Sequence, residues 1–240
     1  TGAREARLTL ARLLISEKRY DEARGHFERL IKDNPDNPDV IYPVAMLALQ
    51  QGDTKTGRSQ LEHLLTTNFP DKSTIHFFLG QLDQEQKNPE AALEQYRQVS
   101  SGEQYIAARS RAAQILMQQG RTNEARALLH STQGGTPAER TQLILAESQL
   151  LREAGRQNEA YILLDSALSS QPDNPEILYE TALTAERIGK PELLETHLKH
   201  LLSIKPDHAH ALNALGYSLA ERNTRLAEAH DLIARALSFQ

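Results

Sequence analysis

The sequence of 240 residues contains no cysteine and no tryptophan, and it contains only three valines. The lack of cysteine excludes disulfides and thiolate metal sites, but it leaves the cellular compartment open. So few valines argue against a fold built mainly of β-strands, which favour β-branched residues. The longest apolar run, residues 44–49, is far shorter than the ~20 residues of a membrane-spanning helix. These absences favour a helical chain with no segment that crosses a bilayer.

The sequence also lacks a strong charge of one sign and lacks familiar catalytic motifs. Its net charge is −5, from 27 basic and 32 acidic residues scattered along the chain. Nucleic-acid-binding proteins usually concentrate basic residues in a stripe, so nucleic acid is a disfavoured partner. There is no nucleotide-binding glycine loop, no HExxH helix and no GxSxG turn, and Gly134 and Gly135 are interpreted as a loop. We therefore expect a protein that is not an enzyme and that needs no cofactor or metal.

What the sequence does contain is a repeat. A short segment recurs seven times, for example as KRYDEARGHFERL, KNPEAALEQYRQV and GRQNEAYILLDSA, and each copy carries a small or apolar residue that we call the anchor. The anchors, spaced by 33 to 35 residues, are Ala23, Gly57, Ala92, Ala125, Ala160, Leu194 and Ala229. Five residues before four of the anchors stand Gly52, Gly120, Gly155 and Gly189. Glycine adopts the left-handed conformation at a helix end without a steric penalty, so these positions predict chain reversals.

Between these landmarks the apolar residues recur with the period of a helix, as in Leu10, Leu13 and Leu14. Each copy therefore predicts a hairpin of two helices. One apolar stripe of the hairpin faces its partner helix and another faces the next hairpin, so neighbours must stack to bury both. The predicted repeats cover residues 4–37, 38–71, 73–103, 105–137, 139–173, 175–207 and 208–240.

This pattern resembles the tetratricopeptide repeat (TPR) family over essentially the whole chain. The clearest matches are FLGQLDQEQKNPEAALEQYRQV, which starts at Phe78, and LNALGYSLAERNTRLAEAHDLIARAL, which starts at Leu212. The resemblance implies an all-α, right-handed superhelical solenoid of about seven helix–turn–helix repeats. It also implies that the first helix of each repeat lines a concave surface.

Some residues depart from the family pattern. Gly57 and Leu194 replace the usual anchor alanine, and Asp83 and Glu147 stand at first-helix positions that are usually apolar. We expect these departures to weaken single repeats and to leave the second and third repeats loosely packed. Pro43 lacks a backbone N–H one turn into its helix, so we expect that helix to be kinked or to start late.

In the TPR family, the residues that line the groove lie at fixed sequence offsets from the anchor. The same offsets from the seven anchors select the candidate groove residues of this sequence. The residues at these positions are Leu8 and Arg12, Tyr42 and Met46, Phe77 and Gln81, Ser110 and Gln114, Leu145 and Gln149, Tyr179 and Leu183, and Asn213 and Tyr217. Aromatic rings among polar side chains are typical of grooves that hold peptides, although such rings also pack between hairpins. The cations that chaperone-binding TPR proteins use to hold a terminal carboxylate are missing, which disfavours acidic chaperone tails.

Two further sets of residues carry expectations. His197 and His200 lie three residues apart on one helix, and we interpret them as solvated rather than as metal ligands. The second helices are expected to form the convex side. Charged residues there, such as Arg126 and Glu195, are therefore expected to be exposed, and changing them is expected to cost little partner binding.

The leading hypothesis is a non-enzymatic scaffold that binds partner proteins or peptides in its groove. In overall style the chain resembles bacterial TPR lipoprotein adaptors of the LbcA type, which are tethered at the outer membrane and deliver substrates to a carboxyl-terminal processing protease. That resemblance implies a periplasmic location through a lipid anchor in a missing N-terminal segment. Because the seventh repeat has no polar capping helix after it, we also expect a fragment whose uncapped terminal repeats can self-associate. The alternatives are an envelope or pilus assembly scaffold, a cytosolic TPR adaptor and, less favoured, a helical-repeat RNA-binding protein.

Overall fold

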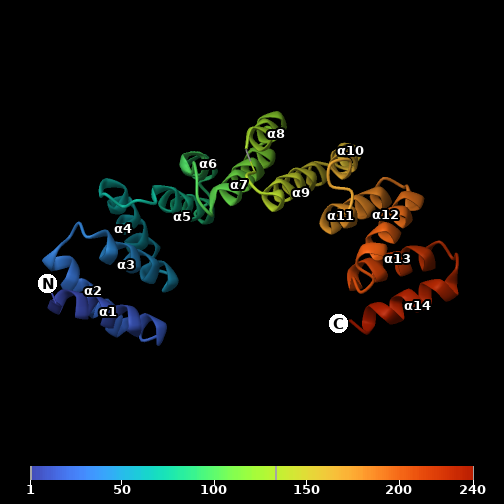
Figure 1. Ribbon diagram of the computed structural model, residues 1–240. Coiled ribbons are helices and arrows are strands. Elements are labelled where there is room, and N and C mark those ends of the chain that lie inside the picture. The colour runs from blue at the N-terminus through green and yellow to red at the C-terminus, as the bar shows by residue number, and fades with distance from the viewer. Residues whose placement is uncertain (1, 133, 240) are drawn as a thin grey trace. The chain divides into compact units, whose positions relative to one another are not determined.

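The computed structural model describes residues 2–132 and 134–239, and this part of the chain contains fourteen α-helices and no strand. The helices are α1 Gly2–Ser16, α2 Tyr20–Asp33, α3 Pro38–Gln50, α4 Thr54–Thr66, α5 Lys72–Glu85, α6 Pro89–Gln98, α7 Tyr105–Gln118, α8 Thr122–Ser131, α9 Pro137–Glu153, α10 Gln157–Leu168, α11 Pro175–Arg187, α12 Pro191–Ile204, α13 Ala209–Glu221 and α14 Leu226–Leu237 (Figure 1). The predicted all-α fold of helical repeats is confirmed.

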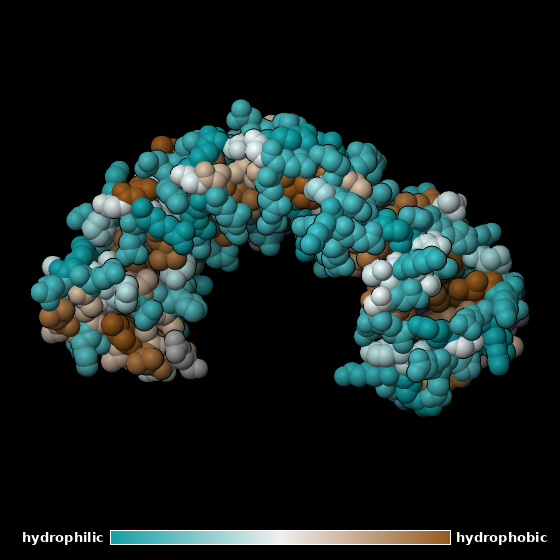
Figure 2. All heavy atoms as spheres, turned by 180° about the vertical axis from the view of Figure 1, so that it is seen from behind, coloured by the Kyte–Doolittle hydropathy of each residue, from teal (hydrophilic) through white to brown (hydrophobic). Residues whose placement is uncertain are grey.

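In the first unit α1, α3 and α5 pack against α2, α4 and α6, and in the second unit α9, α11 and α13 pack against α10, α12 and α14. Contacts of α2 with α3 and of α4 with α5 join successive hairpins in the first unit, and those of α8 with α9, α10 with α11 and α12 with α13 do so in the second. The chain forms two compact units, Thr1–Ile115 and Leu116–Gln240, and the boundary falls within α7. Most of the face seen in Figure 2 is hydrophilic, and hydrophobic residues show between hydrophilic ones in both units.

The chain reverses between paired helices at residues in the left-handed region. The four predicted glycines have this conformation, with φ of 79° at Gly52, 75° at Gly120, 74° at Gly155 and 73° at Gly189. The other reversals use residues that carry a side chain: Lys18 at 61°, Lys87 at 59° and Asn223 at 52°. The reversals were predicted from the glycines, but the lysines gave no such signal because lysine has no preference for this conformation.

The anchors are buried in their hairpins. Ala92, Ala125 and Ala160 are fully buried. At Gly57 an added Cβ would overlap the Leu49 side chain, so Leu49 would have to shift to admit alanine. Because Leu61 and Tyr96 are also fully buried, the expectation of loose packing in the second and third repeats is wrong.

Pro43 does not delay its helix. α3 begins at Pro38 and continues through Pro43 to Gln50, so the expected late start is wrong. Proline suits the first helical position, and the Asn37 side chain accepts the backbone N–H of Asp39 at 3.1 Å. These two features fix the start of the helix, and Pro43 removes only the N–H that would bond to the Asp39 carbonyl.

Buried carboxylates at usually apolar positions are paired with arginines of the preceding hairpin. Asp83 on α5 is 5% exposed and accepts a hydrogen bond of 2.5 Å from Arg58 on α4. Glu147 on α9 is 4% exposed and accepts one of 2.9 Å from Arg126 on α8. Arg126 is therefore part of the joint between two hairpins, and the expectation that it is a freely exposed charge is wrong.

Candidate functional site

The candidate groove residues of the first unit lie in pairs four residues apart, which places the members of each pair on one helix face. Arg12 is exposed, Gln81 and Gln114 are half-buried, and Phe77 is buried. Leu8, Tyr42 and Met46 are half-buried because they also pack against the apolar cores of their repeats. The surface of this unit is thus partly polar, with three half-buried apolar or aromatic side chains.

Tyr42 stacks on a ring that the sequence analysis did not single out. Phe69, which precedes α5, lies parallel to the Tyr42 ring with 5.4 Å between the ring centroids. Burial raises the pKa of Tyr42 above its ordinary value of 10, and the carboxylate of Asp71 adds to the shift. The hydroxyl is therefore protonated near neutral pH and remains available as a hydrogen-bond donor.

Phe77 is not available to a partner. Its side chain is 6% exposed, and its ring centroid lies 6.1 Å from that of Phe78 and 5.9 Å from that of Tyr96. The Arg111 guanidinium lies 6.0 Å from the same ring centroid. The expectation that Phe77 anchors a peptide is wrong, because these neighbours already cover the ring.

In the second unit the candidate residues lie on α9, α11 and α13. Leu145, Tyr179 and Leu183 are half-buried, whereas Gln149, Asn213 and Tyr217 are exposed. α9 and α11 touch directly, and Arg152 of α9 donates to Glu180 of α11. These two first helices therefore form one continuous surface.

Tyr179 is the centre of a ring cluster that includes two histidines. The Tyr179 centroid lies 5.5 Å from that of His208 and 6.5 Å from that of His210. The Nδ1 atom of His208 accepts the backbone N–H of Ala211 at 3.1 Å and so caps α13. Burial raises the pKa of Tyr179 above its ordinary value of 10. Sequence reasoning missed this cluster, although the place of His208 just before a helix was a usable signal.

The cluster continues along an exposed face of α13. His210, Asn213 and Tyr217 follow one another at helical spacing, so they lie on the same side of the helix. All three are exposed, and Tyr217 has 59% of its surface free. We call Tyr179, His208, His210, Asn213 and Tyr217 the α11–α13 surface.

His197 and His200 do not behave alike. His200 is exposed, and its Nε2 atom lies 2.9 Å from Oδ1 of Asp173. His197 is half-buried beside Tyr161, and burial lowers its pKa below 6.5, so the expectation that it is solvated is wrong. Among residues 2–132 and 134–239 no group of three or more histidine, aspartate or glutamate side chains could hold a metal ion.

Glu195 is also not the exposed charge that was expected. Its side chain is 18% exposed and lies 2.7 Å from the Lys199 ammonium and 3.6 Å from the Arg222 guanidinium. Hydrogen bonds from Arg225 and Lys199 lower the pKa of Glu195 from 4.5 to about 2. This carboxylate therefore links α12 to the residues between α13 and α14.

This shift predicts how stability depends on pH. Because the pKa of Glu195 is lower in the folded chain than its ordinary value, its contribution is complete above pH 4.5 and is lost as pH falls toward about 2. We expect Glu195→Gln to be less stable than the parent at pH 6 and to approach it near pH 2. Urea unfolding between these pH values measures the difference, and an unchanged difference across the range would contradict it.

Part of the chain matches the TPR family. The sequence model of the tetratricopeptide repeat family matches residues 1–47 and 14–82. The TPR repeat-containing protein PA4667 of Pseudomonas aeruginosa is 34% identical over 161 residues, which are 67% of this chain. The chain spans only 27% of the length of that relative.

Solved structures agree on the fold. The C-terminal part of a TPR repeat-containing protein from Cytophaga hutchinsonii is 13% identical with a TM-score of 0.65, and the alignment covers 97% of this chain and 95% of that one. A tetratricopeptide repeat protein from Parabacteroides merdae is 13% identical with a TM-score of 0.59, covering 100% of this chain and 94% of that one. The repeats matched in residues 1–82 and the solenoid fold support a TPR repeat protein, and such repeats support a protein-interaction scaffold. No helix in the described residues is both long and apolar enough to cross a membrane.

Proposed function

We propose that the chain is a non-enzymatic scaffold that binds a segment of a partner protein on the α11–α13 surface. The observation that carries the proposal is the exposed Tyr217 ring, which stands on the same helix face as Asn213 and His210. Leaving a ring in water forfeits the free energy of burying it, and a partner recovers that free energy when it covers the ring. Asn213 and His210 provide hydrogen bonds that orient a bound peptide.

The finer function is delivery of client proteins to a carboxyl-terminal processing protease on the periplasmic side of the outer membrane, with the chain tethered through a lipid anchor. This function is supported by the resemblance to lipoprotein adaptors. A second support is the 34% sequence identity with a bacterial TPR repeat-containing protein over 67% of this chain. An envelope or pilus assembly scaffold and a cytosolic adaptor are the alternatives. Identifying the partner distinguishes these three candidate functions.

The partner can be captured by a photoreactive residue. With p-benzoylphenylalanine at position 217 or 210, in the cells that make the protein, we expect one common partner to be crosslinked. The matched control is His230, which is exposed on the second helix α14 and should capture much less of it. A processing protease or its substrates among the products would support the finer function, whereas pilus or envelope components would favour the alternative. Equal capture at position 230 would contradict the surface.

The variant Tyr217→Ala measures how much the Tyr217 ring contributes to the free energy of binding. We expect it to weaken binding of the captured partner by about 1 to 3 kcal/mol, as truncation of interface anchors commonly does. The melting temperature should stay unchanged because the ring is 59% exposed. His230→Ala should leave both quantities unchanged. Calorimetric titration measures the affinity, and loss of stability together with affinity would show that Tyr217 has a structural role instead.

A further inference from the structure

The N-terminus of α13 is capped by the imidazole of His208, a half-buried residue of the α11–α13 surface. Its Nδ1 atom accepts the backbone N–H of Ala211 at 3.1 Å. The amide nitrogen of Ala211 also lies 3.0 Å from the His208 carbonyl oxygen, but that oxygen accepts the N–H of Leu212 as well. Because the donor is a backbone amide, Nδ1 must carry its lone pair, so this cap exists only while the imidazole is neutral.

Other repeats have asparagine where this repeat has histidine. Asn37, Asn174 and His208 each stand 14 residues after an anchor, and each follows a proline and an aspartate. Asn37 accepts the backbone N–H of Asp39, and Asn174 accepts that of Glu176, both at 3.1 Å. An amide side chain does not titrate, whereas histidine ordinarily changes its charge between about pH 5 and 8. α13 therefore begins at a cap that a proton can remove.

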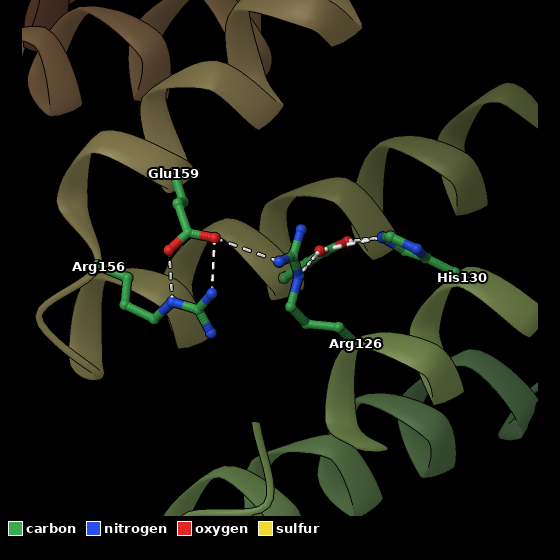
Figure 3. A network of polar contacts seen from close by, with 5 residues as sticks. Arg126, His130, Arg156 and Glu159 are labelled. Atoms are coloured by element: carbon green, nitrogen blue, oxygen red, sulfur yellow. Dashed lines mark hydrogen bonds and ion pairs between the residues drawn. The ribbon is translucent and has the colours of Figure 1, made fainter. Parts of the chain in front are cut away.

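Histidines that contact carboxylates respond to a proton in the opposite sense. The Nε2 atom of His130 on α8 lies 2.9 Å from the buried carboxylate of Glu147 (Figure 3). The Nε2 atom of His200 on α12 lies 2.9 Å from the carboxylate of Asp173. Protonation turns these two contacts into charge-assisted hydrogen bonds. At His208 it instead points a second N–H at a backbone donor.

The titratable groups in ring contact with His208 come from α11 and α13. The Tyr179 ring of α11 has its centroid 5.5 Å from that of His208, and the His210 ring of α13 has its centroid 6.2 Å away. Lys205 and Asp207 precede the cap in the turn after α12. A tyrosine ring attracts a cation, but it offers no acceptor in place of Nδ1. Two protonated histidines at this distance repel each other, so a second proton on His210 opposes the packed arrangement further.

We propose that His208 is a pH-sensitive cap that orders the start of the α11–α13 surface when it is neutral and releases it when it is protonated. With Nδ1 protonated, two N–H groups would meet at 3.1 Å, so the ring turns away from Ala211 and leaves its place against Tyr179. The positive charge also stands at the N-terminus of α13, where the helix dipole disfavours cations. The first turn of α13, which carries His210, then frays.

The consequence for binding rests on the proposed function, because the surface that responds to pH is the one proposed to hold the partner. A partner segment that contacts His210 and Tyr217 needs the first turns of α13 in helical form. We therefore expect the partner to bind at neutral pH and to be released as pH falls from about 8 to about 5.

Nuclear magnetic resonance of the free 240-residue chain tests the cap itself. At pH 8, nuclear Overhauser effects should join the His208 and Tyr179 rings, and at pH 5 they should be lost. Exchange of the Ala211 amide with water, relative to an unfolded peptide at the same pH, should rise about five-fold over this range, as loss of a helix cap commonly gives. In His208→Asn the relative exchange should not change with pH. A ring contact that persists at pH 5 with unchanged relative exchange would overturn the proposal.

Capture with p-benzoylphenylalanine at position 217, in an extract of the cells that make the protein, tests the effect on binding. Capture of the common partner should fall about five-fold between pH 7.5 and pH 5.5. His208→Asn should remove this dependence, whereas His210→Asn and His230→Asn should keep it. Equal capture by the parent at both pH values, or a dependence lost in His210→Asn but kept in His208→Asn, would overturn the proposal. If nothing were captured at either pH, the proposed function would fail, and the cap would still stand or fall by the ring contact with Tyr179.

Discussion

Replacing Arg126 by methionine is expected to lower the free energy of unfolding of the second unit by about 2 to 3 kcal/mol. The change leaves Glu147, 4% exposed, with His130 as its remaining partner. A buried carboxylate that loses its charged partner keeps its desolvation cost and forfeits the compensating interaction. Thermal and urea unfolding followed by circular dichroism measure the loss.

The double variant Arg126→Met/Glu147→Leu is the informative control. It removes both charges and places leucine where the third repeat has Leu79, which is 1% exposed. Apolar replacement of a buried ion pair is often neutral or stabilising, so we expect stability near that of the parent. Arg187→Met, at an exposed residue of α11, should change the free energy of unfolding little. A double variant less stable than Arg126→Met would contradict the assignment of the loss to the unpaired carboxylate.

Two glycine-to-alanine changes are expected to act in opposite directions. At Gly216 on α13 an added Cβ would lie 2.9 Å from the Ala229 carbonyl oxygen and 2.8 Å from Cγ1 of Ile233, so α14 must move away. At Gly25 on α2 nothing lies within 4 Å of the added atom. Overpacking costs about 1 to 3 kcal/mol, whereas alanine in an open helix position gains about 1 kcal/mol.

The difference in stability between these two variants, about 1 to 3 kcal/mol, is the quantity to measure. Gly25→Ala should raise the melting temperature and Gly216→Ala should lower it. Both substitutions have the same chemistry, so helix propensity cancels in the comparison. If both variants were stabilised alike, the close approach of α13 and α14 would be contradicted.

Much of the fold was predictable because it depends on local signals. The anchors and the four glycines set the period and the reversals, whereas the late start expected for α3 from Pro43 was wrong. Lys18 and Lys87 at other reversals could not be predicted, because stacking of the repeats imposes their conformation. Pairing of Asp83 with Arg58 joins residues 25 positions apart, and a single sequence gives no sign of it.

The candidate site was predictable only in part. The offset from the anchor selected Tyr179, Asn213 and Tyr217, which do lie on neighbouring first helices. The same rule also selected Phe77, whose burial depends on Tyr96 and Arg111 around it.

Hydrogen–deuterium exchange of the chain with the partner captured at position 217 tests the scaffold hypothesis most directly. If that partner lies on the α11–α13 surface, amide exchange should slow in α11 and in α13, and it should stay unchanged in the second helices α12 and α14. Tyr217→Ala should remove this protection at the same partner concentration. Protection confined to α12 and α14, with none in α11 or α13, would contradict the claim that the first helices hold the partner.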